Sequence, residues 1–377
     1  MRLSDLTLEK INDRMRLRVT VDWEDCSQPK RELYIETIPP FAGDLSENIH
    51  PFLVGCIIPA MHFGERRISL NEKICPTLEE GLETVQALMV QWSHGQYRPL
   101  IIEAKPLTFP KYPAPLRRAA LFLSGGIDSL AALRVNHLNF PKDHPGFVKD
   151  CIMMHGFDIG GVIQRGMKYH VFDRAIASLS HVAADAGVNL IPVYTNIRHL
   201  CDDRDLWLNK FFGAVLASVA HAFAKRIRLA YIASSYDIPH LHPCGSHPLL
   251  DPFYSSYDLG IIHRDLAMSR MEKIELVSNW DAAFQNLRVC LANVPDRLNC
   301  GRCEKCVRTM LELLAAGTLH KTGAFVEKDV KPEMLSGFSI RIRERQSFYL
   351  EILPLLAGKG RDDLVKTIKH KLLSDPA

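Results

Sequence analysis

Two groups of residues in this 377-residue sequence have types and spacings suited to chemistry. The first is the loop at 124–129, Ser-Gly-Gly-Ile-Asp-Ser, which follows a short apolar segment and precedes a helical pattern. The second is a set of four cysteines at positions 290, 300, 303 and 306. The loop predicts a site for an anion, and the cysteines predict a site for a metal ion.

The loop has the composition of a phosphate site. Adjacent Gly125 and Gly126 allow the backbone to approach a phosphate closely, and the start of a helix favours negative charge. Ser124 and Ser129 can donate their hydroxyls, and Asp128 can cap the helix or orient a metal ion. The spacing matches neither GxxxxGKS/T nor GxGxxG. The alternative is a tight strand-to-helix turn in which Asp128 and Ser129 only cap the helix.

The cysteines have the spacing of a closed metal site. Cys300, Cys303 and Cys306 form two CxxC steps that share one cysteine, and Cys290 lies ten residues upstream of the first. Four thiolates complete a tetrahedral zinc site with bonds of about 2.3 Å, which leaves no open position for catalysis. We therefore expect structural Zn²⁺. An iron–sulfur cluster and redox cysteines remain alternatives.

The segments around these residues alternate between strand and helix. Such alternation predicts an α/β fold, a doubly wound parallel sheet with helices on both faces. The expected strands are 119–123, 151–157, 189–195 and 227–235, and the expected helices are 129–138, 170–187 and 205–226.

The rest of the chain suggests two additional parts. Residues 1–112 contain β-like stretches at 17–23, 32–38 and 50–59 and a helical pattern at 77–92, which together predict an N-terminal accessory α+β domain. A proline-rich linker at 106–116 separates it from a core domain at 113–318. Residues 319–377 form a predicted helical extension. The turn-rich segment 236–257 is long enough to be a functional loop or a lid.

Composition is that of an ordinary soluble globular protein, with 47% hydrophobic and 24% charged residues. The net charge of +3 gives no argument for nucleic acid or an anionic membrane as a partner. The first residues lack the pattern of a signal peptide, and the apolar run 211–224 is too short to cross a bilayer. We expect a cytoplasmic protein whose ten cysteines stay reduced.

The loop also resembles a known signature. SGGIDS after an apolar strand is similar to the SGGxDS motif of the PP-loop ATP pyrophosphatase superfamily, which has a Rossmann-like (HUP-like) fold. The resemblance implies that residues 124–129 hold the pyrophosphate end of ATP, accompanied by Mg²⁺. It further implies that the enzyme transfers AMP to a substrate oxygen, after which a nucleophile displaces the AMP.

A second resemblance narrows the family. The loop, followed by Cys-x9-Cys-x2-Cys-x2-Cys, Arg308 and a Lys/Glu-rich segment at 269–280, looks like the 7-cyano-7-deazaguanine synthase branch over residues 117–314. Those enzymes are ATP-dependent carbon–nitrogen ligases that convert a deazapurine carboxylate to an amide and then a nitrile. The resemblance implies catalytic roles for Asp128, Asp237 and Lys273. The family's substrate-framing segment is not matched beyond Asp237.

Several further residues are candidates with two readings. His155 and Asp158 follow the second strand, where they would contact adenosine or substrate, or would only form a turn. The segment 236–257 contains five residues that could form a metal or acid–base site: His240, His242, Cys244, His247 and Asp251. Alternatively, it is a substrate-facing loop whose histidines lie on the surface.

The open questions concern substrate and partner. The substrate is a small molecule or a protein that supplies the amine, and the N-terminal domain would serve a homodimer or a partner protein. Two alternative functions remain. One is a sulfurtransferase that acts on RNA through Cys201 and Cys244, and the other is a nucleotide-binding subunit without catalysis. No basic stripe with aromatic residues supports nucleic-acid binding by the N-terminal domain.

Overall fold

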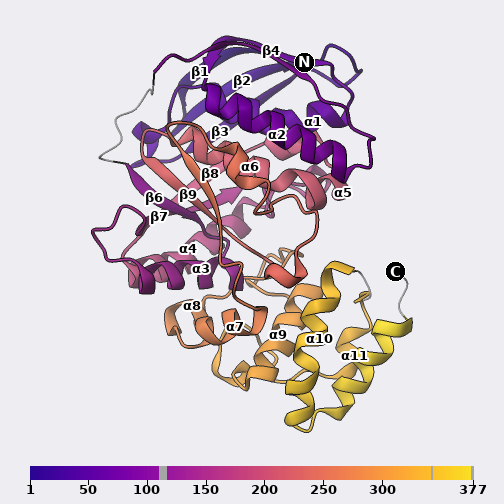
Figure 1. Cartoon of the computed structure of the whole chain (residues 1–377). Helices are drawn as coiled ribbons and strands as arrows, with labels where there is room; N and C mark the ends of the chain where they lie inside the picture. Colours follow the sequence, from indigo (N-terminus) through magenta and orange to yellow (C-terminus); the bar gives the residue numbers. More distant parts are fainter. Residues whose placement is uncertain (110–116, 341–342, 375–377) are drawn as a thin grey trace.

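The computed structural model describes residues 1–109, 117–340 and 343–374, and its central feature is one ten-stranded sheet (Figure 1). The strand order is β10-β9-β6-β7-β8-β3-β2-β1-β4-β5, and most of the strand pairs are parallel. The predicted α/β class with a largely parallel sheet is therefore confirmed.

The parallel half of the sheet carries the glycine loop. Its strands are β6 (Arg118–Phe122), β7 (Val148–His155), β8 (Asn189–Thr195), β9 (Ile227–Ala233) and β10 (Gly260–Arg264). The chain runs outward from β6 to β8, then returns to place β9 on the other side of β6. Open α/β sheets bind ligands at the carboxyl ends of the strands where the order reverses in this way. The loop after β6 lies at that point. Strand β10 was not predicted, because its five residues lie within a turn-rich stretch.

The N-terminal strands extend the same sheet. They are β1 (Arg2–Ile11), β2 (Arg14–Asp22), β3 (Arg31–Thr37), β4 (Arg67–Ile74) and β5 (Ile101–Pro106). Strand β3 pairs antiparallel with β8, with Glu36 opposite Tyr194. Residues on either side of the predicted boundary thus share one sheet. Most of the linker predicted at 106–116 lies outside the described residues.

One predicted element is wrong. The stretch 50–59, read as β-like, is part of helix α1 (His50–His62). Its residues from His50 to Met61 are all buried, so the sequence has no alternation of polar and apolar side chains to distinguish a strand from a helix. The helix predicted at 77–92 is confirmed as α2 (Pro76–Trp92).

Helices cover both faces of the sheet, as predicted (Figure 1). Along β6, Ala120 and Phe122 point into one core and Leu121 into the other, because successive strand residues face opposite sides. The first core contains residues of α1, α2 and α6 (Phe212–Ala222), which follows α5 (Arg204–Leu206) and a π-helical turn, Trp207–Phe211. The second contains residues of α3 (Ile127–Asn139), α4 (Tyr169–Ala186), α7 (Arg270–Ser278), α8 (Asp281–Gln285) and α9 (Glu304–Ala316).

The C-terminal segment adds α10 (Arg343–Gly358) and α11 (Asp362–Ser374), which lie next to α9 in Figure 1. The buried side chains of Phe348 and Tyr349 face the ends of α7 and α9. Within the described ranges, no helix combines the length and the apolar character needed to cross a membrane.

Candidate functional site

The glycine loop has a backbone shape that requires glycine. Gly125 adopts φ +81°, and a Cβ there would lie 3.1 Å from Leu179 Cδ2 and 3.2 Å from Arg288 Cβ. Gly126 is the N-cap of α3, and no side chain within the described residues caps this helix. The first N–H groups of a helix have no carbonyl partner inside it. They are therefore available to an anion at this loop.

Hydrogen bonds hold the loop in place. The Ser129 hydroxyl donates to the Gly126 carbonyl (3.0 Å) and accepts from the Ser124 N–H (3.2 Å). The Arg288 N–H donates to the Gly125 carbonyl (2.9 Å), and its guanidinium reaches the Ser124 carbonyl (3.4 Å). Segment 287–290 therefore stabilises the glycine loop through Arg288.

Asp128 is surrounded by cations. Its Oδ1 lies 3.0 Å from Arg270 Nη1 and 3.6 Å from Lys273 Nζ, both from α7. The Lys273 ammonium is almost completely buried and also donates to the Ser234 carbonyl after β9 (2.7 Å). Asp128 and Lys273, both predicted as catalytic from separate segments, are thus brought together. Asp128 pairs with cations and does not cap α3.

A second carboxylate shares Arg270. Glu312 on α9 accepts from Arg270 Nη2 and Nε, each at 3.1 Å, and its side chain is fully buried. Burial raises the pKa of Glu312 above its usual value even though Arg270 and Arg308 oppose this. Burial alone would likewise raise the pKa of Asp128, but Arg270, Lys273 and Arg308 hold it below its usual value. Asp128 therefore stays ionised beside the loop.

Arg308 lies near the N-terminal end of α9. Its Nε lies 3.2 Å from a Glu304 carboxylate oxygen, and its guanidinium lies over the Phe348 ring at 4.1 Å from the centroid. Phe348 also stacks on Tyr236 from the loop after β9. Helix α10 therefore covers one side of the charge cluster, which is formed by Asp128, Arg270, Lys273, Arg308 and Glu312.

Asp265 is a further carboxylate in this region. It follows β10 with φ +64°, and its Oδ2 is buried without a hydrogen-bond partner among the described residues. Burial raises the pKa of Asp265, and the charges of Arg264 and Lys273 oppose that rise. Asp128 is near enough to contribute to the same shift, so the two carboxylates lie in one neighbourhood.

Sequence reasoning missed Asp265, Arg270, Arg288 and Glu312. For Arg270 a signal existed, because it precedes Lys273 by three residues and therefore lies on the same helix face. The other three are placed by long-range packing, which local patterns do not encode.

His155 and Asp158, predicted to contact nucleotide or substrate, differ in position. His155 is fully buried, stacks on Tyr169 and bonds the Met167 carbonyl through Nε2 (2.5 Å), and burial lowers its pKa. Its ring thus has no surface to offer a ligand in this structure. The Asp158 carbonyl accepts from Asn293 (2.8 Å), whose side chain also binds Arg288 (2.8 Å). Asp158 is therefore linked to the glycine loop.

Asp237 lies apart from this cluster. It precedes the 3-10 turn Ile238–His240, and its carboxylate is bonded to His240 Nδ1. No described contact joins it to Asp128 or Lys273. Its predicted catalytic role has no support in this geometry and remains a prediction.

The four cysteines meet at one point. All four sulfur atoms lie within 4.8 Å of one another, and the pairs Cys300–Cys306 and Cys290–Cys303 are each 3.9 Å apart. A tetrahedral zinc ion with bonds of about 2.3 Å requires sulfur atoms about 3.8 Å apart. Backbone N–H groups of Arg302 and Cys303 also point at Cys300 Sγ (3.4 and 3.2 Å). The cluster is a possible metal site, compatible with zinc.

The cysteine cluster is connected to the charge cluster at both ends. Cys290 lies two residues after Arg288, which holds the glycine loop. Cys303 is the N-cap of α9 and Cys306 is in its first turn, and this helix carries Arg308 and Glu312. An ion bound to the four sulfurs would therefore cross-link the two segments that position the loop and its cations.

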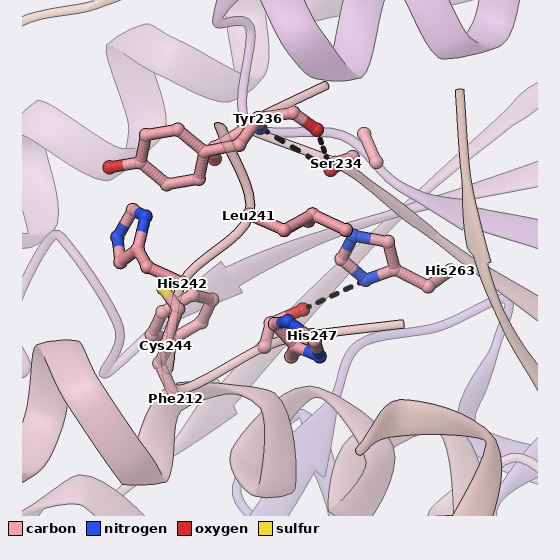
Figure 2. A pocket seen from close by; sticks show the side chains of 11 residues that line it. Phe212, Ser234, Tyr236, Leu241, His242, Cys244, His247 and His263 are labelled. Carbon is pink, nitrogen blue, oxygen red and sulfur yellow. Dashed lines mark hydrogen bonds between the residues drawn. The ribbon is translucent and has the colours of Figure 1, made fainter. Parts of the chain in front are cut away.

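A small pocket lies beside the charge cluster, at the carboxyl ends of β9 and β10 (Figure 2). His263 lines it and bonds Asp251 through Nδ1 (2.7 Å), with Ser246 donating to the same carboxylate oxygen (2.5 Å). The wall also contains residues from the segment that follows β9: Ser234, Tyr236, Leu241, His242, Cys244 and His247.

The two cysteines considered for sulfur transfer differ in exposure. Cys201 is buried, and burial raises the pKa of its thiol, which disfavours the reactive thiolate. Cys244 lines the pocket and its thiol points at the Leu208 carbonyl (3.5 Å).

Comparison of the chain with protein-family models, with curated proteins and with solved structures finds no match. Function must therefore be argued from the chemistry of the site itself.

Proposed function

We propose that the protein is an ATP-dependent ligase of the 7-cyano-7-deazaguanine synthase type, with a PP-loop core. It would transfer AMP from ATP to a carboxylate or amide oxygen and then exchange AMP for ammonia or an amine. The observation that carries the proposal is the meeting of an uncapped helix N-terminus with Arg270, Lys273 and Arg308 at the point where the strand order reverses.

The residues support adenylation in a definite division of roles. The N–H groups at 127–129 and the Ser124 hydroxyl would bind the pyrophosphate part of ATP, while the Ser129 hydroxyl, which donates to the Gly126 carbonyl, would keep the loop in shape. The Lys273 ammonium would stabilise the charge that builds on the phosphate oxygens as the α-phosphorus is attacked. Asp128 holds Arg270 and Lys273 at the mouth of the loop through its own charge. Adenylation makes the substrate oxygen part of a good leaving group.

Two ions belong to the proposal. Mg²⁺, which accompanies ATP phosphates, would be held by phosphate oxygens and by the carboxylates of Asp128 and Asp265, whose buried Oδ2 lacks a partner among the described residues. Zinc held by Cys290, Cys300, Cys303 and Cys306 would supply no catalytic step. It would fix α9 and segment 287–290 against the loop.

Location and partners follow from the same proposal. We place the enzyme in the cytoplasm, where its cysteines stay reduced. The substrate is a deazapurine or another small molecule, or a protein. Strands β1–β5 and helices α1 and α2 would form the accessory α+β part, which would contact a second copy or a partner protein.

The test supplies metal-replete protein with ATP, Mg²⁺, ammonia and 7-carboxy-7-deazaguanine, and follows AMP and the mass of the base together. We expect one AMP for each amide formed, and none of either with Asp128→Ala. ATP binding, measured as a rise in melting temperature, identifies a non-catalytic nucleotide subunit if it occurs without AMP. A lack of AMP with this and other carboxylates would overturn the ligase proposal.

A further inference from the structure

The pocket at the ends of β9 and β10 has the size of a single small molecule. Its volume is about 20 Å³, and one water molecule needs about 10 to 15 Å³ on this measure. Ammonia and ammonium have the size of water, so this space accommodates one of them. In Figure 2 Leu241 lies between Tyr236 and His242 on one side and His263 on the other.

His263 contributes a buried imidazole to the wall of this pocket. Its Nδ1 lies 2.7 Å from Asp251 Oδ2, and the two side chains are 4% and 0% exposed. Asp251 also accepts from the Ser246 hydroxyl (2.5 Å) and the His247 N–H (3.3 Å), which fixes its orientation. When Nδ1–H donates to a carboxylate, the neutral imidazole has its lone pair on Nε2. This Nε2 is buried and has no hydrogen-bond partner among the described residues.

The pocket adjoins the charge cluster through one residue. Ser234 lines the pocket, while its carbonyl accepts from Lys273, the partner of Asp128. The Ser234 N–H donates to the carbonyl of Arg264, the residue after His263 (2.9 Å). Ser234 therefore links the pocket directly to Lys273, which the proposed function assigns to the phosphate oxygens.

We propose that this pocket is the ammonium site of the enzyme and that His263 is the general base, oriented by Asp251, which is a positioning residue. The inference rests on the proposed ligase function. Ammonium gives a proton to His263 Nε2, and the nitrogen lone pair attacks the carbonyl carbon of the acyl adenylate. The carbon–nitrogen bond forms, the carbon–oxygen bond to phosphate breaks, and AMP leaves with that electron pair. The second proton lost by the nitrogen passes to the AMP phosphate.

The experiment separates adenylation from amide formation in His263→Gln and Asp251→Asn. Exchange of labelled pyrophosphate into ATP, with 7-carboxy-7-deazaguanine present, reports the first step, and amide formation from ammonia reports the second. We expect exchange within about twofold of the wild type and a loss in ammonia transfer of about 10²- to 10⁴-fold, the usual contribution of a general base. His181→Gln, on the exposed surface of α4, is the matched control and should behave as wild type.

The outcomes are distinguishable. If the wild type exchanges pyrophosphate and makes amide while His263→Gln does so equally well, the pocket is not the ammonium site and only this inference fails. A parallel loss of exchange and transfer, or transfer of methylamine as readily as ammonia, also overturns it. If the wild type gives neither exchange nor AMP, the ligase proposal fails and this inference falls with it. Melting curves and zinc content of each variant establish that it folds.

Discussion

Arg270 Nη1 lies 3.0 Å from Asp128 Oδ1 while the rest of the same guanidinium binds the fully buried Glu312, so one arginine joins three helices. Asp128 is in the first turn of α3, Arg270 begins α7, and Glu312 is on α9. Burial alone would lower the pKa of Arg270, but its two carboxylate partners raise it above its usual value. The glycine loop is therefore tied to α9, the helix at whose N-terminus two of the four clustered cysteines, Cys303 and Cys306, lie.

Removing Arg270 should be costly because it leaves Glu312 without a partner. Loss of one member of a buried ion pair costs about 3 to 5 kcal/mol. We expect a decrease of that size in the free energy of unfolding of Arg270→Met, measured by urea denaturation. Asp128→Asn should cost less, because the Asp128 side chain is 26% exposed, yet it should abolish AMP formation.

The control for this prediction is Arg66→Met. Arg66 pairs with Asp25 on the surface with 87% of its side chain exposed, and such pairs contribute about 0 to 1 kcal/mol. Equal losses for Arg66→Met and Arg270→Met would contradict the role assigned to burial.

A comparison of Gly125→Ala with Gly187→Ala should separate the effect of backbone strain from the loss of the proposed phosphate site. Both Gly125 (φ +81°) and Gly187 (φ +67°) have left-handed backbones, which cost a residue with a Cβ about 1 to 2 kcal/mol. A Cβ at 187 would meet nothing within 4 Å, whereas one at 125 would press on Leu179 and Arg288. We expect both variants to melt at lower temperature, and only Gly125→Ala to lose the ATP-induced rise in melting temperature. An unchanged ATP response in Gly125→Ala would exclude the loop as the nucleotide site.

The cysteine cluster leads to a prediction about the zinc content of the protein and about the effect of losing that zinc. We expect about one zinc ion per chain by mass spectrometry, lost in Cys303→Ser and retained in Cys26→Ser, whose cysteine lies outside the cluster. Loss of the ion should release α9 and segment 287–290. The melting temperature and the affinity for ATP should then fall together. Iron with a visible absorption band would instead identify an iron–sulfur cluster, and metal loss without any effect on ATP binding would separate the two sites.

Short sequence patterns predicted those features of the fold and the site that depend on residues close together in the chain. The strand–loop–helix around Gly125 and the convergence of four cysteines depend on short spacings, and both were readable from sequence. The partners of Asp128 were only partly readable, because Glu312 is 184 positions away and is brought there by helix packing. The pairing of β3 with β8 was equally hidden, since edge pairing depends on register between distant segments. His263 and Asp251 lie in a turn-rich stretch whose five-residue strand β10 has no periodic signal.

The free energy of unfolding should depend on pH because of a buried histidine, His221, which lies on the face of the sheet opposite α3, α7 and α9. His221 on α6 is fully buried and its Nε2 bonds the Tyr254 carbonyl (2.7 Å). Burial lowers its pKa from 6.5 to about 4, although the hydrogen bond to Tyr254 opposes this. Between these values the unfolded chain binds a proton that the folded chain does not. Stability must therefore fall as the pH drops from 6.5 towards 4.

The size of this effect follows from the shift. At 1.36 kcal/mol per pKa unit, His221 contributes a loss of about 3 kcal/mol across that interval. His221→Gln can still donate to the Tyr254 carbonyl but cannot titrate, so its free energy of unfolding should fall less steeply than that of the wild type. Urea denaturation at about pH 7, 5.5 and 4.5 measures both slopes. The pKa values of the buried His155 and the half-buried His199 are also lowered, but these residues contribute equally to both proteins. The difference between the two slopes therefore reports His221 alone. Parallel curves for the two proteins would mean that His221 is protonated in the folded state, or that its burial is relieved by local opening.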